Sequence, residues 1–158
     1  MEVTYRVAGM GDMDELVRLR LEYLTADFGE LDSVQADGIR SVLPDYLQRH
    51  LCDDLHAEVA CCDGKLVGTC WLLVAEKPAS VAFPHGRTAA VFNVYVDPDY
   101  RRRGIARELM TRLIAKAEQL RLDRLELRAT AMGYELYRSI GFVDDESSHT
   151  AMNYVVGQ

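Results

Sequence analysis

The chain has 158 residues, of which 49% are hydrophobic and 27% are charged, and its formal net charge is -7. This length and composition fit one globular domain and exclude a disordered or fibrous chain. A general nucleic-acid binder is expected to be basic, because phosphate contacts need Lys and Arg. The acidic balance therefore argues against a nucleic-acid partner and favours an amine-bearing one.

Neither the N-terminal residues nor the cysteines indicate an exported or metal-binding protein. The chain has no signal-peptide pattern at its start, and no apolar run approaches the roughly 18 residues of a membrane-spanning helix. Cys52, Cys61, Cys62 and Cys70 form no CxxC pair and have no histidines at zinc-like spacing. We therefore predict buried, reduced cysteines, no metal site, no membrane partner and a cytoplasmic location.

The N-terminal part of the chain is predicted to form one strand followed by two short helices. Residues 4–8 have the pattern of a strand, and Asp12 with Glu15 resembles a capping box at the start of a helix that ends at Gly29. Apolar residues then recur at helical spacing over 39–51. Pro44 lies inside that second pattern, so a break or a kink is expected there.

From residue 56 onward the pattern changes to strands. Two apolar runs, 56–62 and 66–77, flank Asp63-Gly64, a strong signal for a β-hairpin. The remaining predicted elements are, in order, a strand, a helix, a strand, a short helix and a last strand, at 88–98, 101–120, 123–129, 132–140 and 148–156. This order predicts an α/β protein in layers, with a parallel crossover from Val91 to Arg128.

The most informative segment is the turn between the strand that ends at Val96 and the helix that begins near Gly104. The first amides of a helix lack intrahelical partners, and the helix dipole places positive charge behind them. Small side chains at Gly104 and Ala106 let a phosphate approach the backbone, and three consecutive arginines, 101–103, add charge. The segment therefore favours a diphosphate site over an ordinary basic helix start.

Two motifs in this chain resemble those of the GNAT superfamily of N-acetyltransferases. The sequence R-x-x-G-x-A at residues 101–106 is similar to the family signature of Gln or Arg, two residues, Gly, one residue, and Gly or Ala. The sequence L-Y-x-x-x-G-F at residues 136–142 is similar to a second family segment, at the right distance and in the right order. One departure is Thr130, which stands where many members have Asn and which lacks the paired donor and acceptor of an amide.

The resemblance implies a GNAT fold over a single domain, 1–158: a mixed, mostly antiparallel sheet that is splayed at its centre, with helices on both faces. Acetyl-CoA, the acetyl donor, would lie in a V-shaped opening between the strand ending at Val96 and the strand 125–128. Tyr137 would protonate the departing thiolate. The implied donor-binding residues are Val94, Tyr95 and Val96 through their backbone, Arg101, Arg102, Arg103, Gly104, Ile105 and Ala106 around the pyrophosphate, and Thr130 and Tyr137.

The implied reaction is direct attack of an amine, from a small molecule or a peptide, on the thioester. Glu22, Asp27, Glu126 or a water chain is the candidate base, and Asn93 is placed to orient a water. The four histidines form no evident constellation. A homodimer is compatible with the sequence. Two alternatives stay open: a fold that senses acyl-CoA or binds a partner without turnover, and a nucleic-acid or phosphoprotein binder that uses Arg107 together with the arginine run.

Overall fold

A computed structural model describes residues 2–157. The chain divides into two compact units, Met1–Arg128 and Ala129–Gln158, and each is described by itself. The single domain expected from the sequence stays a prediction.

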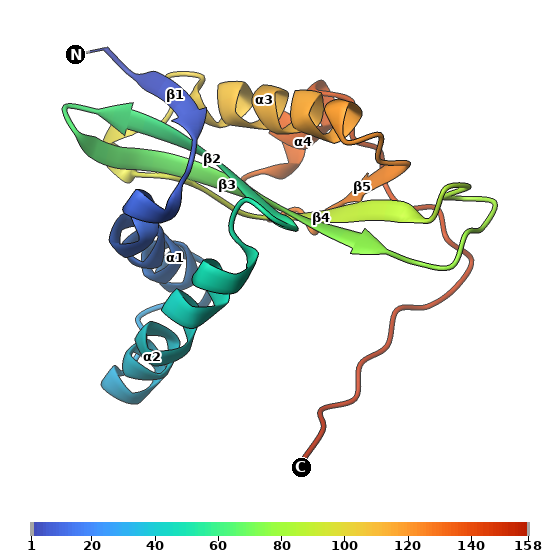
Figure 1. The fold of residues 1–158 in the computed structure, drawn as a ribbon, viewed down its shortest axis with the longest axis horizontal. Helices are drawn as coiled ribbons and strands as arrows, with labels where there is room; N and C mark the ends of the chain where they lie inside the picture. The colour runs from blue at the N-terminus through green and yellow to red at the C-terminus, as the bar shows by residue number, and fades with distance from the viewer. Residues whose placement is uncertain (1, 158) are drawn as a thin grey trace. The chain divides into compact units, whose positions relative to one another are not determined.

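The first unit is built on one five-stranded sheet whose strands lie in the order β1-β2-β3-β4-β5 (Figure 1). The first three neighbouring pairs are antiparallel, and β4 and β5 are parallel. The bounds of the strands are β1 Thr4–Val7, β2 Leu55–Cys62, β3 Lys65–Glu76, β4 Arg87–Val96 and β5 Arg124–Glu126. The predicted hairpin is present, because the turn at Asp63 and Gly64, both with positive φ, joins β2 to β3.

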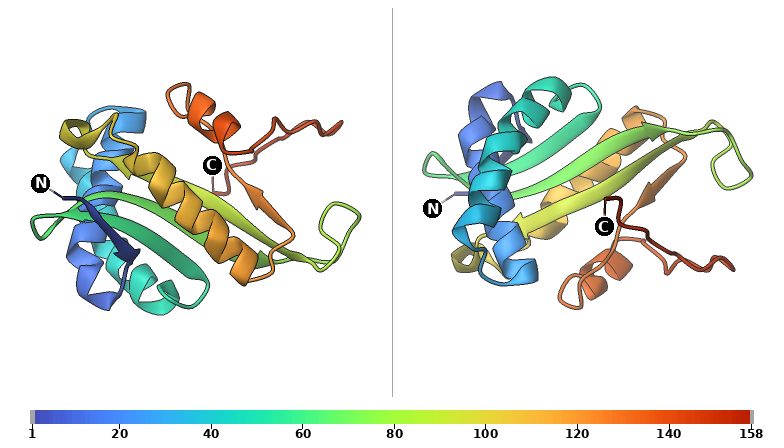
Figure 2. Two further views of the ribbon diagram at one scale, coloured as in Figure 1. Left: turned by 90° about the horizontal axis from the view of Figure 1, so that it is seen from above. Right: turned by 90° about the horizontal axis from the view of Figure 1, so that it is seen from below.

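Helices cover both faces of this sheet. Helices α1 (Met13–Phe28) and α2 (Ser33–His50) lie on one face, and α3 (Ile105–Gln119) lies on the other (Figure 2). Helix α3 connects the parallel strands β4 and β5, as the crossover pattern predicts. The predicted fold class, α/β with a mixed, mostly antiparallel sheet between helices, is confirmed.

Each face of the sheet has its own apolar layer. Leu16 and Leu19 of α1 and Leu47 of α2 pack with Trp71 of β3 on the first face. On the other face the apolar side of α3 is buried, with Ile105, Leu109, Met110 and Leu113 at most 2% exposed. Full burial of each such side chain stabilises the fold by about 1.5–3 kcal/mol. The two layers fix α1 and α3 on opposite faces of β4.

The start of α1 differs from its prediction. Asp12 and Glu15 do not form a capping box around the helix. Asp12 instead accepts two hydrogen bonds of 2.7 Å from Arg6 and one from the Gly9 amide, across a short 3-10 turn (Met10–Asp12). Glu15 is bonded to Arg18. A bidentate arginine contact outcompetes a single bond to a backbone amide.

Helix α2 also differs, because it continues through Pro44 without a break. The proline removes one intrahelical hydrogen bond, and the packed residues on both sides of it, Leu43 and Leu47, hold the helix together. A capping box of Asp32 and Gln35, which the sequence analysis missed, begins the helix. The two helices span 16 and 18 residues, so the expectation of two short helices is wrong. Within residues 2–157, no helix is both long and apolar enough to cross a membrane.

The second unit contains one short helix, α4 (Tyr134–Ser139). The strand predicted over 148–156 is absent: these residues are exposed and have no secondary structure. Alternating apolar residues make a strand only where a neighbouring strand accepts their hydrogen bonds, and no such pairing is present for this segment within the described residues.

The cysteines follow their prediction only in part. Cys62 and Cys70 are buried and Cys61 is partly buried, but Cys52 is exposed. Cys52 follows the end of α2 with a φ of 67°, outside the apolar layers. All four are free thiols.

Candidate functional site

A bulge in β4 marks the centre of the candidate site. Phe92 pairs with Trp71 of β3 and Tyr95 pairs with Thr69, so that two residues, Asn93 and Val94, stand opposite one. Asn93 has a φ of 52°, in the left-handed region that asparagine tolerates better than most residues. A bulge of this kind bends the strand and redirects its backbone groups.

Beyond the bulge, the sheet is open along one side of β4. Strand β5 pairs with β4 only from Thr88 to Ala90, and residues 91–96 have no strand on that side within the part of the chain that the structure describes. The sheet is therefore splayed at its centre, as predicted. The strand β5 itself is shorter than the predicted 123–129. The backbone of Val94, Tyr95 and Val96 is left to pair with an extended ligand, as a sheet edge pairs with a peptide.

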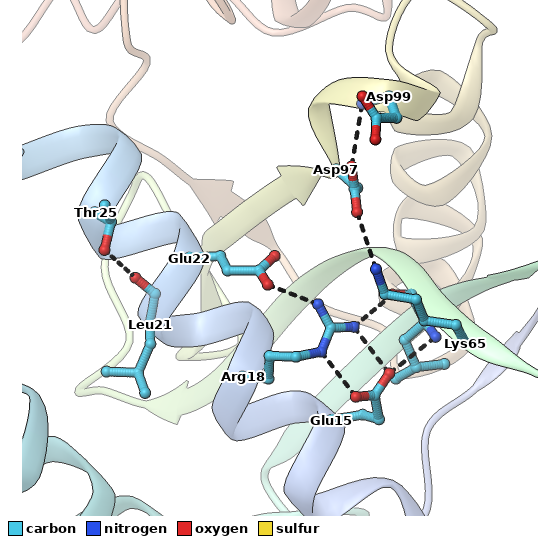
Figure 3. A network of polar contacts seen from close by, with 9 residues as sticks. Glu15, Arg18, Leu21, Glu22, Thr25, Lys65, Asp97 and Asp99 are labelled. Carbon is cyan, nitrogen blue, oxygen red and sulfur yellow. Dashed lines mark hydrogen bonds and ion pairs between the residues drawn. The ribbon is translucent and has the colours of Figure 1, made fainter. Parts of the chain in front are cut away.

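The turn that follows β4 is held by hydrogen bonds at Asp97. Its amide donates to the Val67 carbonyl at 2.9 Å, and its Oδ1 accepts from the Asp99 amide at 3.1 Å. Lys65 Nζ lies 3.4 Å from Asp97 Oδ2 (Figure 3). A short 3-10 turn, Pro98–Tyr100, then carries the chain toward α3. These bonds tie the end of β4 to the neighbouring strand β3.

The three arginines at 101–103 do more than add charge, because two of their side chains form hydrogen bonds to the backbone. Arg101 Nε donates to the Val96 carbonyl at 2.9 Å. Arg103 Nη2 donates to the Asp99 carbonyl at 3.0 Å. Arg102 is exposed, with a φ of 60°. Two of the three side chains therefore tighten the turn, and all three contribute positive charge to it.

The backbone between β4 and α3 presents a row of free amides. Gly104, with a φ of 78°, is the N-cap residue of α3. Within residues 2–157, the amides from Arg102 to Ala106 have no hydrogen-bond partner. At the start of the helix, the Glu108 amide donates to the carbonyl of the N-cap residue Gly104. Successive free amides at the start of a 15-residue helix have the geometry that favours anion binding, and the anion-binding role of this turn stays a prediction. The predicted residues 101–106 are thus brought together in one turn, next to Val94–Val96.

A polar network joins α1 to this turn. Arg18 lies between Glu15 and Glu22, with contacts of 2.8 and 2.7 Å, and also donates to the Leu66 carbonyl of β3 (Figure 3). Burial, and then the neighbouring Glu22 carboxylate, raise the pKa of Tyr95. Glu22, one of the three candidate bases, is thus engaged by Arg18 and Tyr95.

A pocket of about 320 Å³ lies on the same face of the sheet, between α2 and strands β3 to β5. Glu126, a second candidate base, lines it and lies 3.7 Å from Lys77. His50 and Asp54 also line it, with Nδ1 and Oδ1 2.7 Å apart. No histidine constellation was predicted, and this pair was not anticipated, although the four-residue spacing of His50 and Asp54 at the end of a helix was an available signal. Asp27, the third candidate, is exposed near the end of α1.

Thr130 and Tyr137 belong to the second unit, where the structure brings them together. Thr130 Oγ1 accepts a hydrogen bond of 3.2 Å from the Gly133 amide. A Cβ atom on Gly133 would come within 2.8 Å of the Tyr137 ring and 3.4 Å of Thr130 Oγ1. The Tyr137 ring also meets Phe142 edge to face, at 6.0 Å. Gly133 thus allows the close approach of these two predicted site residues.

Comparison with known proteins assigns this architecture to a class. A sequence profile described as the acetyltransferase (GNAT) family matches residues 16–142. A predicted acetyltransferase from Clostridium acetobutylicum, solved with acetyl-CoA, has 25% identity and a TM-score of 0.83, and covers 96% of each chain. A ribosomal-protein-alanine N-acetyltransferase from Brucella melitensis has 26% identity and a TM-score of 0.68, over 97% of this chain and 100% of that one.

A sequence relative points to the same class over a shorter stretch. The [Ribosomal protein bS18]-alanine N-acetyltransferase of Escherichia coli is 44% identical over 57 residues, which are 34% of this chain and 38% of the relative. The alignment thus spans well under half the length of that relative. The profile match covers most of the chain, and the chain belongs to the acetyltransferase (GNAT) family. The family expected from the two motifs is confirmed.

Proposed function

We propose that the protein is an N-acetyltransferase that moves an acetyl group from acetyl-CoA to an amine. The observation that carries the proposal is the continuous backbone site made by the open side of β4 and the free amides from Arg102 to Ala106. An extended pantetheine arm requires the first part, and a pyrophosphate requires the second. Membership of the GNAT family supports this assignment.

In this proposal the open strand orients the thioester for direct attack. A backbone amide next to the bulge at Asn93 donates to the thioester carbonyl oxygen as negative charge develops there. Tyr137 stabilises or protonates the departing thiolate. A tyrosine near pKa ~10 is a weaker acid than a thiol near ~8.5, so full proton transfer is uphill by roughly 2 kcal/mol and a strong hydrogen bond serves as well.

The attacking amine must lose a proton, because a lysine-like amine near pKa ~10.4 is mostly charged at neutral pH. Glu22, Asp27, Glu126 or a water chain remains the proposed acceptor of that proton. Of these, Glu126 lines a pocket, and this favours it as the base because an amine substrate can reach it there. The cysteines lie outside both motifs, so no acyl-cysteine step is included.

The test is calorimetric titration of the purified protein with acetyl-CoA, with CoA and ATP as comparison ligands. Saturable one-to-one binding of acetyl-CoA, followed by thiol release with an amine panel, is the expected result. Binding without transfer to any amine would favour an acyl-CoA sensor. Absence of binding at millimolar acetyl-CoA would refute the proposal.

A further inference from the structure

Arg20 of α1 is a partly buried cation that faces β4. Its Nη1 atom donates to Asn93 Oδ1 at 3.2 Å, and its guanidinium lies 5.6 Å from the centre of the Tyr23 ring and 5.8 Å from that of Phe92. Within residues 2–157, no carboxylate lies within ion-pair distance of Arg20. Arg18, two residues earlier on the same helix, has two. Arg20 is therefore held by aromatic rings and an amide, not by an anion.

This arrangement leaves the positive charge of a partly buried side chain without a carboxylate partner among the described residues. Burial lowers the pKa of Arg20, which reflects the unfavourable desolvation of its charged form. A buried cation is ordinarily paired with an anion, and the chain as a whole carries a net charge of -7. Acidic side chains are plentiful in the chain, yet none of those that the structure describes forms an ion pair with this arginine.

Asn93 adds a second donor that lacks an acceptor. The residue is fully buried at the bulge of β4, its Oδ1 accepts from Arg20, and its Nδ2 has no hydrogen-bond partner within the described residues. An unpaired buried amide adds positive partial charge to the same spot and costs about 1–3 kcal/mol. Asn93 Nδ2 is itself inaccessible, so a ligand meets the partly exposed guanidinium of Arg20. That group offers donors only, so its ligand must supply acceptor oxygens and negative charge.

Arg20 and Asn93 lie near the place where the amine substrate is expected to bind. Asn93 directly precedes Val94, where the backbone proposed to bind pantetheine begins. On the other side, Arg20 lies close enough to Tyr46 to interact with it electrostatically, and Tyr46 lines the pocket between α2 and the sheet. Arg20 thus contacts β4 next to the proposed acetyl-donor strand and interacts with one residue of the pocket lining, although it does not itself line the pocket.

We propose that Arg20, positioned by Asn93, binds a carboxylate of the acceptor, so that the acceptor class is amines that also carry a carboxylate, such as amino acids. The guanidinium suits this role because it binds both oxygens of a carboxylate at once. Tyr23 and Phe92 supply aromatic walls beside the anion. This inference rests on the proposed acetyltransferase function and specifies its substrate.

The test compares each L-amino acid with its own carboxamide as acceptor, by thiol release from acetyl-CoA. The key variant is Asn93→Asp: aspartate tolerates a positive φ, still accepts from Arg20, and neutralises the guanidinium with a carboxylate of the chain itself. We expect the acid-to-amide ratio of kcat/KM to fall at least tenfold in Asn93→Asp and in Arg20→Gln. The different basicity of the two amines cancels when ratios are compared between variants.

The control is Arg40→Gln, an exposed arginine of α2 paired with Asp37 at 3.0 Å, which should leave the ratio within twofold of the original. A merely structural contact between Arg20 and residue 93 survives in Asn93→Asp, so an unchanged ratio there would overturn the inference. A protein that binds acetyl-CoA but accepts no carboxylated amine would overturn it too. Failure of the unmodified protein to bind acetyl-CoA is a separate result, which refutes the proposed function itself.

Discussion

Two motif glycines, Gly104 and Gly141, adopt left-handed backbone conformations at opposite ends of helices. Gly104, with a φ of 78°, stands at the start of α3, and the amides around it have no partners within residues 2–157. Gly141, with a φ of 109°, follows the end of α4. There the Gly141 amide donates to Arg138 and the Phe142 amide donates to Tyr137, at 3.2 and 3.0 Å.

The comparison shows that one residue type serves opposite purposes in the two motifs. Gly104 turns the backbone so that the nearby amides stay without partners among residues 2–157, as the predicted anion site requires. Gly141 turns it so that the last carbonyls of α4 are satisfied, in a Schellman arrangement with its usual apolar contact, here between Phe142 and Tyr137. The first motif therefore leaves backbone donors without partners, and the second fixes the position of a side chain.

The largest effect on activity is expected when the Tyr137 side chain is changed. Tyr137→Phe should lower kcat on the order of 100-fold, because it removes the proton donor, while acetyl-CoA affinity changes less than twofold. Steady-state kinetics and titration with acetyl-CoA separate the two quantities. Tyr134→Phe is the matched control, since Tyr134 lies in the same helix and its hydroxyl donates to Asp144 at 2.8 Å. A loss of affinity with kcat intact would make Tyr137 a packing residue.

A smaller effect is expected at the free amides. Gly104→Val should weaken acetyl-CoA binding on the order of tenfold, because a β-branched residue disfavours the left-handed conformation and turns the amides away. Gly64→Val carries the same strain, at a φ of 80° and also with open space around it, but in the hairpin between β2 and β3. Equal acetyl-CoA affinities in these two variants would show that backbone geometry at Gly104 is irrelevant to binding.

The smallest effect is expected at Gly141. Gly141→Ala should destabilise the end of α4 by about 1 kcal/mol, so that the Phe142 amide exchanges its hydrogen roughly fivefold faster. Hydrogen exchange followed by NMR measures this directly. The control is Gly38→Ala, in the interior of α2. Hydrogen exchange of the α2 amides should be slower or unchanged in that variant, because alanine favours a helix. Unchanged protection at Phe142 would mean that the Gly141 turn does not hold the helix end.

Local sequence patterns predicted the parts of the fold that depend on short-range order. The hairpin at Asp63-Gly64, the turn before Gly104 and the end of α1 at Gly29 all follow from the backbone preferences of a few neighbouring residues. The prediction of a last strand over 148–156 was wrong, because a strand needs a partner from elsewhere in the chain. The prediction of a capping box at Asp12 was wrong for a related reason, since Arg6 competes for the Asp12 carboxylate.

The candidate site divides in the same way. The anion turn and the Tyr137 segment each lie within one short motif, so the sequence identifies them, although their roles stay predictions. Arg20 and Asn93 are 73 positions apart and meet only because α1 packs on β4 at a bulge. Nothing in the alternation of residues 88–96 indicates that bulge. The pair His50 and Asp54 was within reach of the sequence, at helical spacing, and was overlooked.

The open side of β4 has a consequence for the protein before it meets any ligand. An unpaired strand in the middle of a sheet is a template on which another chain can add a strand, as at any exposed sheet edge. A molecule that occupies this side removes the template and also stabilises the folded state by mass action, by about 2.7 kcal/mol at a concentration 100 times its Kd. We therefore expect a ligand bound to this strand to protect the chain from self-association as well as from unfolding.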